Sequence, residues 1–218
     1  MIRIILLGCP GAGKGTQARY LSEYYDIPLI ATGDILRATA ESGSALGLKV
    51  KEVMEKGKLV SDDIIIEIVK DRLRHTDCHK GYLLDGFPRT IAQAEALHRS
   101  GIKIDYVIEI SVCDDDIVDR LSGRRIHSES GRTYHIKYKL PEVPGFDDLT
   151  GEPLVQRDDD REETIRERLR VYHEKTELLI NYYHNLIDKG ELDSKYIRVD
   201  GIGEIEEVRQ RILDSIGS

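Results

Sequence analysis

The segment that most constrains the fold of this chain is residues 2–16, Ile-Arg-Ile-Ile-Leu-Leu-Gly-Cys-Pro-Gly-Ala-Gly-Lys-Gly-Thr. An apolar run typical of a buried strand leads into glycines and then a helix start. Gly8 and Gly13 have four residues between them and Lys14 follows directly, which is the spacing of a P-loop. Glycines let successive backbone N–H groups point at one anion, and the helix dipole adds positive potential. The pattern predicts a phosphate site, although Gly15 replaces the usual Ser or Thr and Thr16 comes one place later.

Short apolar runs alternate with amphipathic stretches along the rest of the chain. We expect strands at Arg3–Leu7, Leu29–Ala31, Tyr82–Leu84, Tyr106–Ser111 and Tyr196–Val199. We expect helices at Gly15–Tyr24, Asp62–Arg74 with Ser61 as N-cap, Thr90–Arg99, Asp114–Leu121, Asp160–Ile187 and Glu204–Ile216. Short, almost fully apolar strands that alternate with helices predict an α/β fold, with a parallel sheet flanked by helices on both faces. Ligands of such sheets bind at the carboxyl ends of the strands.

Two segments interrupt this alternation. Residues 32–60 are helical but not obviously core-forming, and residues 123–160 are rich in Gly and Pro. Within the second segment, Arg132–Tyr138 alternates weakly, as a solvent-facing hairpin would. A segment of this length inside an α/β domain is usually functional. We therefore expect two small mobile excursions from a single rigid core made of residues 1–31, 61–122 and 161–218.

Composition limits the classes of partner. The 218 residues suffice for one domain, and a net charge of −8 disfavours nucleic acid. The N-terminal apolar run is too short for a membrane span. The three cysteines, Cys9, Cys78 and Cys113, are odd in number and widely spaced, which argues against a disulfide framework. We expect a cytoplasmic protein without a nucleic-acid or membrane partner.

A second motif is Gly-Tyr-Leu-Leu-Asp-Gly-Phe-Pro-Arg at residues 81–89. Its apolar residues end in Asp85, so a carboxylate stands at the tip of a strand, which is the Walker-B arrangement for Mg²⁺ or its water shell. Arg89 follows a proline turn and could point at a phosphate. The alternative at this point is that Asp85 only caps the next helix.

Further candidate anion sites come from a third motif and from arginines. Thr32-Gly-Asp-Ile-Leu-Arg37 follows a strand and opens a helix, so it is either a second anion site or a simple N-cap with an exposed arginine. Arginines able to grip two phosphate oxygens lie near the Gly- and Pro-rich segment, at Arg120, Arg124, Arg157 and Arg168. Aspartates at 114–116, 119 and 158–160 offer them ordinary ion-pair partners. Spacing alone does not select the catalytic arginines.

Four motifs occur in one order along nearly the whole chain: Gly-Cys-Pro-Gly-Ala-Gly-Lys-Gly-Thr, Thr-Gly-Asp-Ile-Leu-Arg, Asp-Gly-Phe-Pro-Arg-Thr and Gly-Arg-Arg-Ile-His. In them the chain resembles the adenylate kinases of the long-lid bacterial type. The resemblance implies a P-loop NTPase-like fold, with residues 32–60 as an AMP-binding excursion and 123–160 as a β-rich lid. It also implies a monomer that transfers the γ-phosphoryl group of Mg-ATP reversibly to AMP, gives two ADP and maintains adenine nucleotide balance.

The resemblance implies a role for each matching residue. ATP would be held by Gly11, Ala12, Gly13, Lys14, Gly15, Thr16, Arg120, Arg124, Thr133, Tyr134 and Gly203. AMP would be held by Thr32, Arg37, Lys58, Leu59, Val60, Gly86, Phe87, Pro88, Arg89, Gln93, Arg157 and Arg168, with the Gln93 amide on the adenine edge. The catalytic charges would be Lys14, Arg89, Arg124, Arg157 and Arg168. Mg²⁺ would come with the nucleotide, and Asp85 would hold it through water.

Some members of this family carry zinc in the lid on four cysteine-type ligands. The corresponding residues here are His127, Ser130, Asp147 and Thr150. Hydroxyl groups are poor zinc ligands beside thiolate or imidazole. We therefore expect a hydrogen-bonded polar cluster and no structural zinc.

Two other functions compete with this interpretation. One is a nucleoside monophosphate kinase with UMP or CMP as acceptor, or GTP as donor; Gln93 and the long lid argue against the first, while donor choice stays open. The other is a P-loop switch protein, for which a guanine motif such as Asn-Lys-x-Asp would be diagnostic. The sequence contains no such motif.

Overall fold

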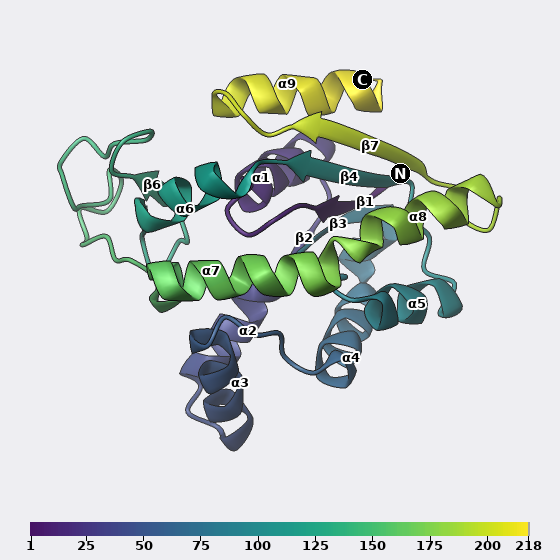
Figure 1. Ribbon diagram of the computed structural model, residues 1–218, viewed down its shortest axis with the longest axis horizontal. Helices are drawn as coiled ribbons and strands as arrows, with labels where there is room; N and C mark the ends of the chain where they lie inside the picture. Colours follow the sequence, from purple (N-terminus) through teal and green to yellow (C-terminus); the bar gives the residue numbers. More distant parts are fainter. Residues whose placement is uncertain (218) are drawn as a thin grey trace.

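The computed structural model describes residues 1–217, whose centre is a five-stranded parallel sheet (Figure 1). The strand order is β2-β3-β1-β4-β7. The strands are β1 (Ile2–Leu7), β2 (Leu29–Ala31), β3 (Gly81–Asp85), β4 (Tyr106–Ser111) and β7 (Lys195–Asp200). Each is an expected strand, and β1, β3 and β7 are one residue longer at one or both ends. In register, Leu6 of β1 pairs with Asp85 of β3 and Ile108 of β4, so the carboxyl ends of the central strands lie together.

Helices cover both faces of this sheet. The covering helices are α1 (Lys14–Tyr25), α4 (Asp62–Leu73), α5 (Ile91–Arg99), α6 (Asp114–Ser122), α7 (Glu162–Val171), α8 (Leu178–Asp188) and α9 (Ile205–Ile216). Two more, α2 (Thr32–Glu41) and α3 (Ala45–Glu55), project from it. Because strand residues alternate in direction, Ile4 and Leu6 pack with α1, α6, α7 and α9, while Ile5 and Leu7 pack with α4, α5 and α8. The predicted α/β class, a parallel sheet flanked by helices, is confirmed.

The long helix expected at Asp160–Ile187 differs from the prediction. It begins at Glu162, and residues Tyr172–Thr176 between α7 and α8 form a π-helical turn. Figure 1 shows α7 and α8 as one long green ribbon across the molecule. Asp160 lies before the helix in the 3-10 turn Asp158–Asp160, where its fully buried carboxylate binds Arg124. In the π turn, the Thr176 hydroxyl donates to the carbonyl of Arg89 at 2.8 Å, which ties this helix to the loop after β3.

Two parts project from the sheet, as Figure 1 shows. One is the helical pair α2–α3. The other, within residues 123–160, contains the antiparallel strands β5 (Arg124–Ile126) and β6 (Thr133–His135). The expected hairpin is present, but only part of it faces solvent. Ile136 and Tyr138 are exposed, whereas Tyr134 and His135 are buried and their polar atoms bind within this segment and to α6.

Two smaller observations complete the fold. Ser61 is the N-cap residue of α4, as expected, but its side chain makes no capping hydrogen bond. Within residues 1–217, no helix is both long and apolar enough to cross a membrane.

Candidate active site

The loop between β1 and α1 has the backbone of an anion cradle. Gly8, Gly11 and Gly13 have φ values of 141°, 82° and 94°, which side-chain-bearing residues rarely adopt. A Cβ on Gly8 would also lie 2.5 Å from the carbonyl oxygen of Ile110 on β4. Glycine at these positions is therefore required by the turn, and the loop opens directly into the N-terminus of α1.

Lys14 supplies the positive side-chain charge of this loop. Its Nζ donates to the carbonyl oxygens of Gly8 at 2.8 Å and Cys9 at 2.7 Å. Burial lowers the pKa of Lys14 to about 8, partly opposed by the negative charge of Asp85. Burial raises the pKa of the Asp85 carboxyl, against the nearby charges of Lys14 and Arg89. Because its hydrogen-bond partners are carbonyl oxygens, the Lys14 ammonium group can exchange them for phosphate oxygens without breaking a hydrogen-bonded ion pair.

A cavity of about 810 Å³ opens above this loop. Every residue predicted for nucleotide binding lines it except Phe87, together with Asp85 and apolar side chains from α2–α4. Phe87 is only 1% exposed and its ring packs in the core under the loop after β3. The Phe87 side chain is therefore turned away from the cavity, and its assignment to the AMP-binding residues stays a prediction.

One end of the cavity lies between the loop after β3 and the helix α2. The Thr32 hydroxyl donates to the Gly86 carbonyl at 2.8 Å, and Arg89 Nε donates to the same oxygen at 2.8 Å. Arg37 pairs with Asp34 of its own helix. Gly57 has a φ of 68°, and a Cβ at this position would lie 3.1 Å from Arg168 Cγ and from the Thr164 carbonyl oxygen on α7. Residues 58–60, which follow it, line the cavity.

Arginines converge between this end and the P-loop. Arg124 binds Asp160 through two nitrogens, Nε at 2.7 Å and Nη2 at 2.5 Å. Arg168 Nη1 lies 2.8 Å from the Asp159 carboxylate. Burial and neighbouring arginines lower the pKa values of Arg89 and Arg157 to about 10.

Positive charge in this cluster is incompletely neutralised. The Nε of Arg157 is buried and has no hydrogen-bond partner among the described residues. A buried, unpaired donor on a cation is costly unless an anion completes it. This unpaired donor, among arginines whose pKa values are lowered by burial and by one another, makes the region a candidate site for a multiply charged anion.

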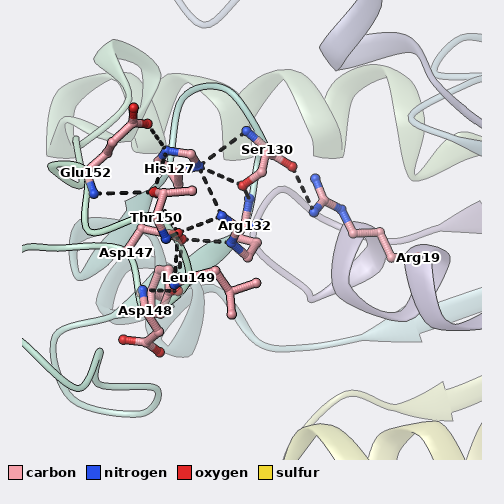
Figure 2. A network of polar contacts seen from close by, with 10 residues as sticks. Arg19, His127, Ser130, Arg132, Asp147, Asp148, Leu149, Thr150 and Glu152 are labelled. Atoms are coloured by element: carbon pink, nitrogen blue, oxygen red, sulfur yellow. Dashed lines mark hydrogen bonds and ion pairs between the residues drawn. The ribbon is translucent and has the colours of Figure 1, made fainter.

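The segment 123–160 holds a compact polar network, shown in Figure 2. His127 Nδ1 lies 2.8 Å from the Ser130 hydroxyl and its Nε2 lies 3.3 Å from the Thr150 hydroxyl. Thr150 Oγ1 in turn donates to Asp147 Oδ2 at 3.0 Å. The structure thus brings together His127, Ser130, Asp147 and Thr150, the four residues at the positions where some family members carry zinc ligands.

Residues not singled out from the sequence complete this network. Arg132 binds Asp147 through Nε at 2.8 Å and Nη2 at 2.6 Å, and Glu152 contacts His127 Nε2 at 2.5 Å. Arg132 lies in the sequence between the pair His127 and Ser130 and the pair Asp147 and Thr150. Nothing else in the sequence indicated that it would join this network. Among the described residues, no group of three or more His, Cys, Asp or Glu side chains is arranged to hold a metal.

Two further arginines that line the cavity make contacts near its P-loop, and one of them, Arg19, joins the projecting segment to the core. Arg120 of α6 donates to the Gly201 carbonyl at 3.0 Å. Arg19 of α1 donates to the Ser130 carbonyl at 3.3 Å, as Figure 2 shows. Arg19 gave no sequence signal, because a single arginine on an amphipathic helix is usually solvated.

The match to known proteins agrees with this geometry. The family model described as adenylate kinase matches residues 6–188, most of the chain. This family supports a phosphotransferase that acts on nucleoside monophosphates, and the P-loop and the arginine cluster line one cavity. By this match, the chain belongs to the adenylate kinase family.

Proposed function

We propose that this protein transfers the γ-phosphoryl group of Mg-ATP to AMP reversibly, giving two ADP, and so maintains adenine nucleotide balance. The observation that carries the proposal is the position of the arginine cluster, with its orphan Arg157 Nε, in one cavity with the P-loop. A kinase for two nucleotides needs one charged region between its donor and acceptor. A switch protein binds a single nucleotide and does not require a second nucleotide site at the end of the cavity beside α2.

The residues divide into donor and acceptor sides. The P-loop from Gly11 to Thr16 would surround the ATP phosphates, while Arg120, Thr133, Tyr134 and Gly203 would border the rest of ATP. Thr32, Arg37, residues 58–60, Gly86, Pro88 and Gln93 would hold AMP. Lys14, Arg89, Arg124, Arg157 and Arg168 would stabilise charge on the transferring group. Transfer is direct and in line, because positioning and charge suffice for this chemistry.

Asp85 fits the requirements for holding Mg²⁺ with the nucleotide. Its carboxylate lies at the strand end that faces the P-loop, and a Cβ on Gly15 would be 3.4 Å from Asp85 Oδ2. Carboxylate and water are the ligands that Mg²⁺ prefers. The ion would neutralise phosphate charge, with Asp85 bound through water.

We further propose that residues 32–60 and 123–160 move over the bound nucleotides and exclude water, which would otherwise accept the phosphoryl group. A monomer in the cytoplasm is the simplest setting, and the three free cysteines, Cys9, Cys78 and Cys113, suit a reducing compartment.

The deciding experiment measures ADP formation from Mg-ATP offered with AMP, CMP, UMP or GMP separately, and then with GTP as donor. We expect AMP to give the highest kcat/KM. Faster reaction with CMP or UMP would establish the alternative acceptor specificity. Nucleotide binding without transfer to any acceptor would support a switch.

A further inference from the structure

Both ends of the Gln93 amide are already bound by the protein. Gln93 is buried, lines the cavity and belongs to the first turn of α5. Its Oε1 accepts from the backbone N–H of Arg89 at 2.7 Å. Its Nε2 donates to Asp62 Oδ1, at the start of α4, at 2.6 Å.

These two partners fix which way the amide points. The Arg89 N–H can only donate and an ionised carboxylate can only accept, so each recognises one end of the amide. A flipped amide would set NH₂ against N–H and a carbonyl oxygen against the carboxylate, leaving buried polar groups unpaired. The Thr90 hydroxyl also donates to Asp62 Oδ1 at 3.0 Å, while its oxygen accepts from the Gln93 backbone N–H at 3.2 Å.

The fixed amide keeps one hydrogen on Nε2 and one lone pair on Oε1 for a ligand. An adenine edge presents an acceptor at N1 and a donor at its 6-amino group, which complements this pair. Hypoxanthine and guanine present the reverse order, a donor at N1 and an acceptor at the 6-oxo group. Apolar cavity residues Leu36, Met54, Val60 and Ile65 would border the base.

We propose that Asp62, acting with the Arg89 backbone N–H, sets the base specificity of the acceptor site by locking the Gln93 amide for 6-amino purines against 6-oxo purines. Asp62 is a positioning residue, since it acts through Gln93 and does not line the cavity. This inference rests on the proposed function, in which the Gln93 end of the cavity holds the acceptor monophosphate. The lock disfavours binding of 6-oxo purines, because these bases would require the unfavourable flip of the Gln93 amide.

The test compares AMP with inosine monophosphate, which differs from AMP only by the 6-oxo group and the N1 proton. In the wild type, kcat/KM should strongly favour AMP. Asp62→Asn keeps the shape but can offer either an acceptor or a donor, so the amide can flip at lower cost. We expect the ratio of the two kcat/KM values to fall by about tenfold or more, since unpaired buried polar groups dominate such discrimination. KM for ATP should stay unchanged.

Two other variants separate positioning from a structural role. Asp63→Asn changes an exposed carboxylate in the same helical turn and should keep the wild-type ratio. Asp62→Ala should lower the ratio as Asp62→Asn does, with a melting temperature measured for each. Equal losses with AMP and inosine monophosphate in both Asp62 variants would overturn the proposal and assign Asp62 to packing.

Failure of the proposed function would look different. A wild type that forms no ADP from ATP and AMP refutes the function before any variant is made. If CMP proves the better acceptor, the same comparison applies to CMP against UMP, because these bases differ in the same donor and acceptor order. An unchanged ratio there would also overturn the role of Asp62.

Discussion

Arg124 and Asp160 form a two-point ion pair where the 123–160 segment rejoins the core, with Nε to Oδ2 at 2.7 Å and Nη2 to Oδ1 at 2.5 Å. The carboxylate is fully buried, and its Oδ1 also lies 3.5 Å from Nη1 of Arg168. One aspartate therefore orients two of the proposed catalytic cations. Asp160 binds the Nε–Nη2 edge of Arg124 and lies near Nη1 alone of Arg168, so each guanidinium keeps other N–H groups for phosphate oxygens.

Replacing Asp160 with Asn should release both arginines. We expect the free energy of unfolding to fall by about 1.5–3 kcal/mol, the usual worth of hydrogen bonds to a charged group. Activity should fall mainly in kcat, because the displaced cations act on the transferring group. Urea unfolding and steady-state kinetics measure both effects, with the exposed Asp158→Asn as control. A wild-type kcat in a folded Asp160→Asn variant would contradict this role.

Lys14 should matter for the chemical step more than for the fold. Its ammonium group is held by two loop carbonyls and can follow charge that moves onto the β,γ-bridging oxygen. Loss of one preorganised contact typically costs ~3–4 kcal/mol, so Lys14→Ala should lower kcat by roughly 10²–10³. Single-turnover kinetics and circular dichroism test this. Near-normal kcat in the folded variant would remove Lys14 from the mechanism.

The lowered pKa of Lys14 predicts a pH dependence. Burial lowers it from 10.5 to about 8, so the free enzyme loses this charge above pH 8. We expect kcat/KM for ATP to fall above that pH, since this ratio reports free-enzyme ionisations. Between pH 8 and 10.5 the unfolded chain binds more protons at Lys14, so this residue's contribution to the free energy of unfolding rises with pH. A Lys14→Arg variant should lack both trends, and their persistence would assign them to another group.

Gln93 should act on one substrate only. Gln93 lines the cavity, and its amide keeps one hydrogen and one lone pair beyond its two protein partners. Gln93→Ala should therefore raise KM for AMP more than KM for ATP. The measurement is a pair of substrate titrations at saturating partner. Equal changes in the two KM values would show that Gln93 only supports the loop after β3.

The sheet and the P-loop could be predicted because their signals are local. Apolar strands and positive-φ glycines are readable from neighbouring residues, and Leu29–Ala31 and Tyr106–Ser111 have their predicted bounds. The ion-pair partners were not predictable in detail. Arg124 could have paired with any of several nearby aspartates, and only packing buries Asp160 beside it. The links from Asp62 to Gln93 and from Arg19 to Ser130 join distant segments, so nothing in local sequence indicated them.

The last prediction concerns the cluster of His127, Ser130, Asp147 and Thr150. Its hydrogen bonds, extended by Arg132 and Glu152, cross-link the segment 123–160. We expect purified protein to contain no stoichiometric zinc, and dialysis against EDTA to leave the melting temperature unchanged once Mg²⁺ is restored. Zinc at one per chain by atomic emission would contradict this expectation.

Changing all four residues to Cys tests whether the same positions can hold a metal. Thiolates are better zinc ligands than hydroxyls, and the paired spacing suits a tetrahedral site. Without zinc the variant should be less stable than wild type, because Arg132 loses its Asp147 carboxylate and Glu152 loses His127. Added zinc should raise its melting temperature, while wild type and a variant with only Ser130 and Thr150 changed should gain less. Stabilisation that is independent of zinc would show that the four side chains do not converge as the hydrogen bonds indicate.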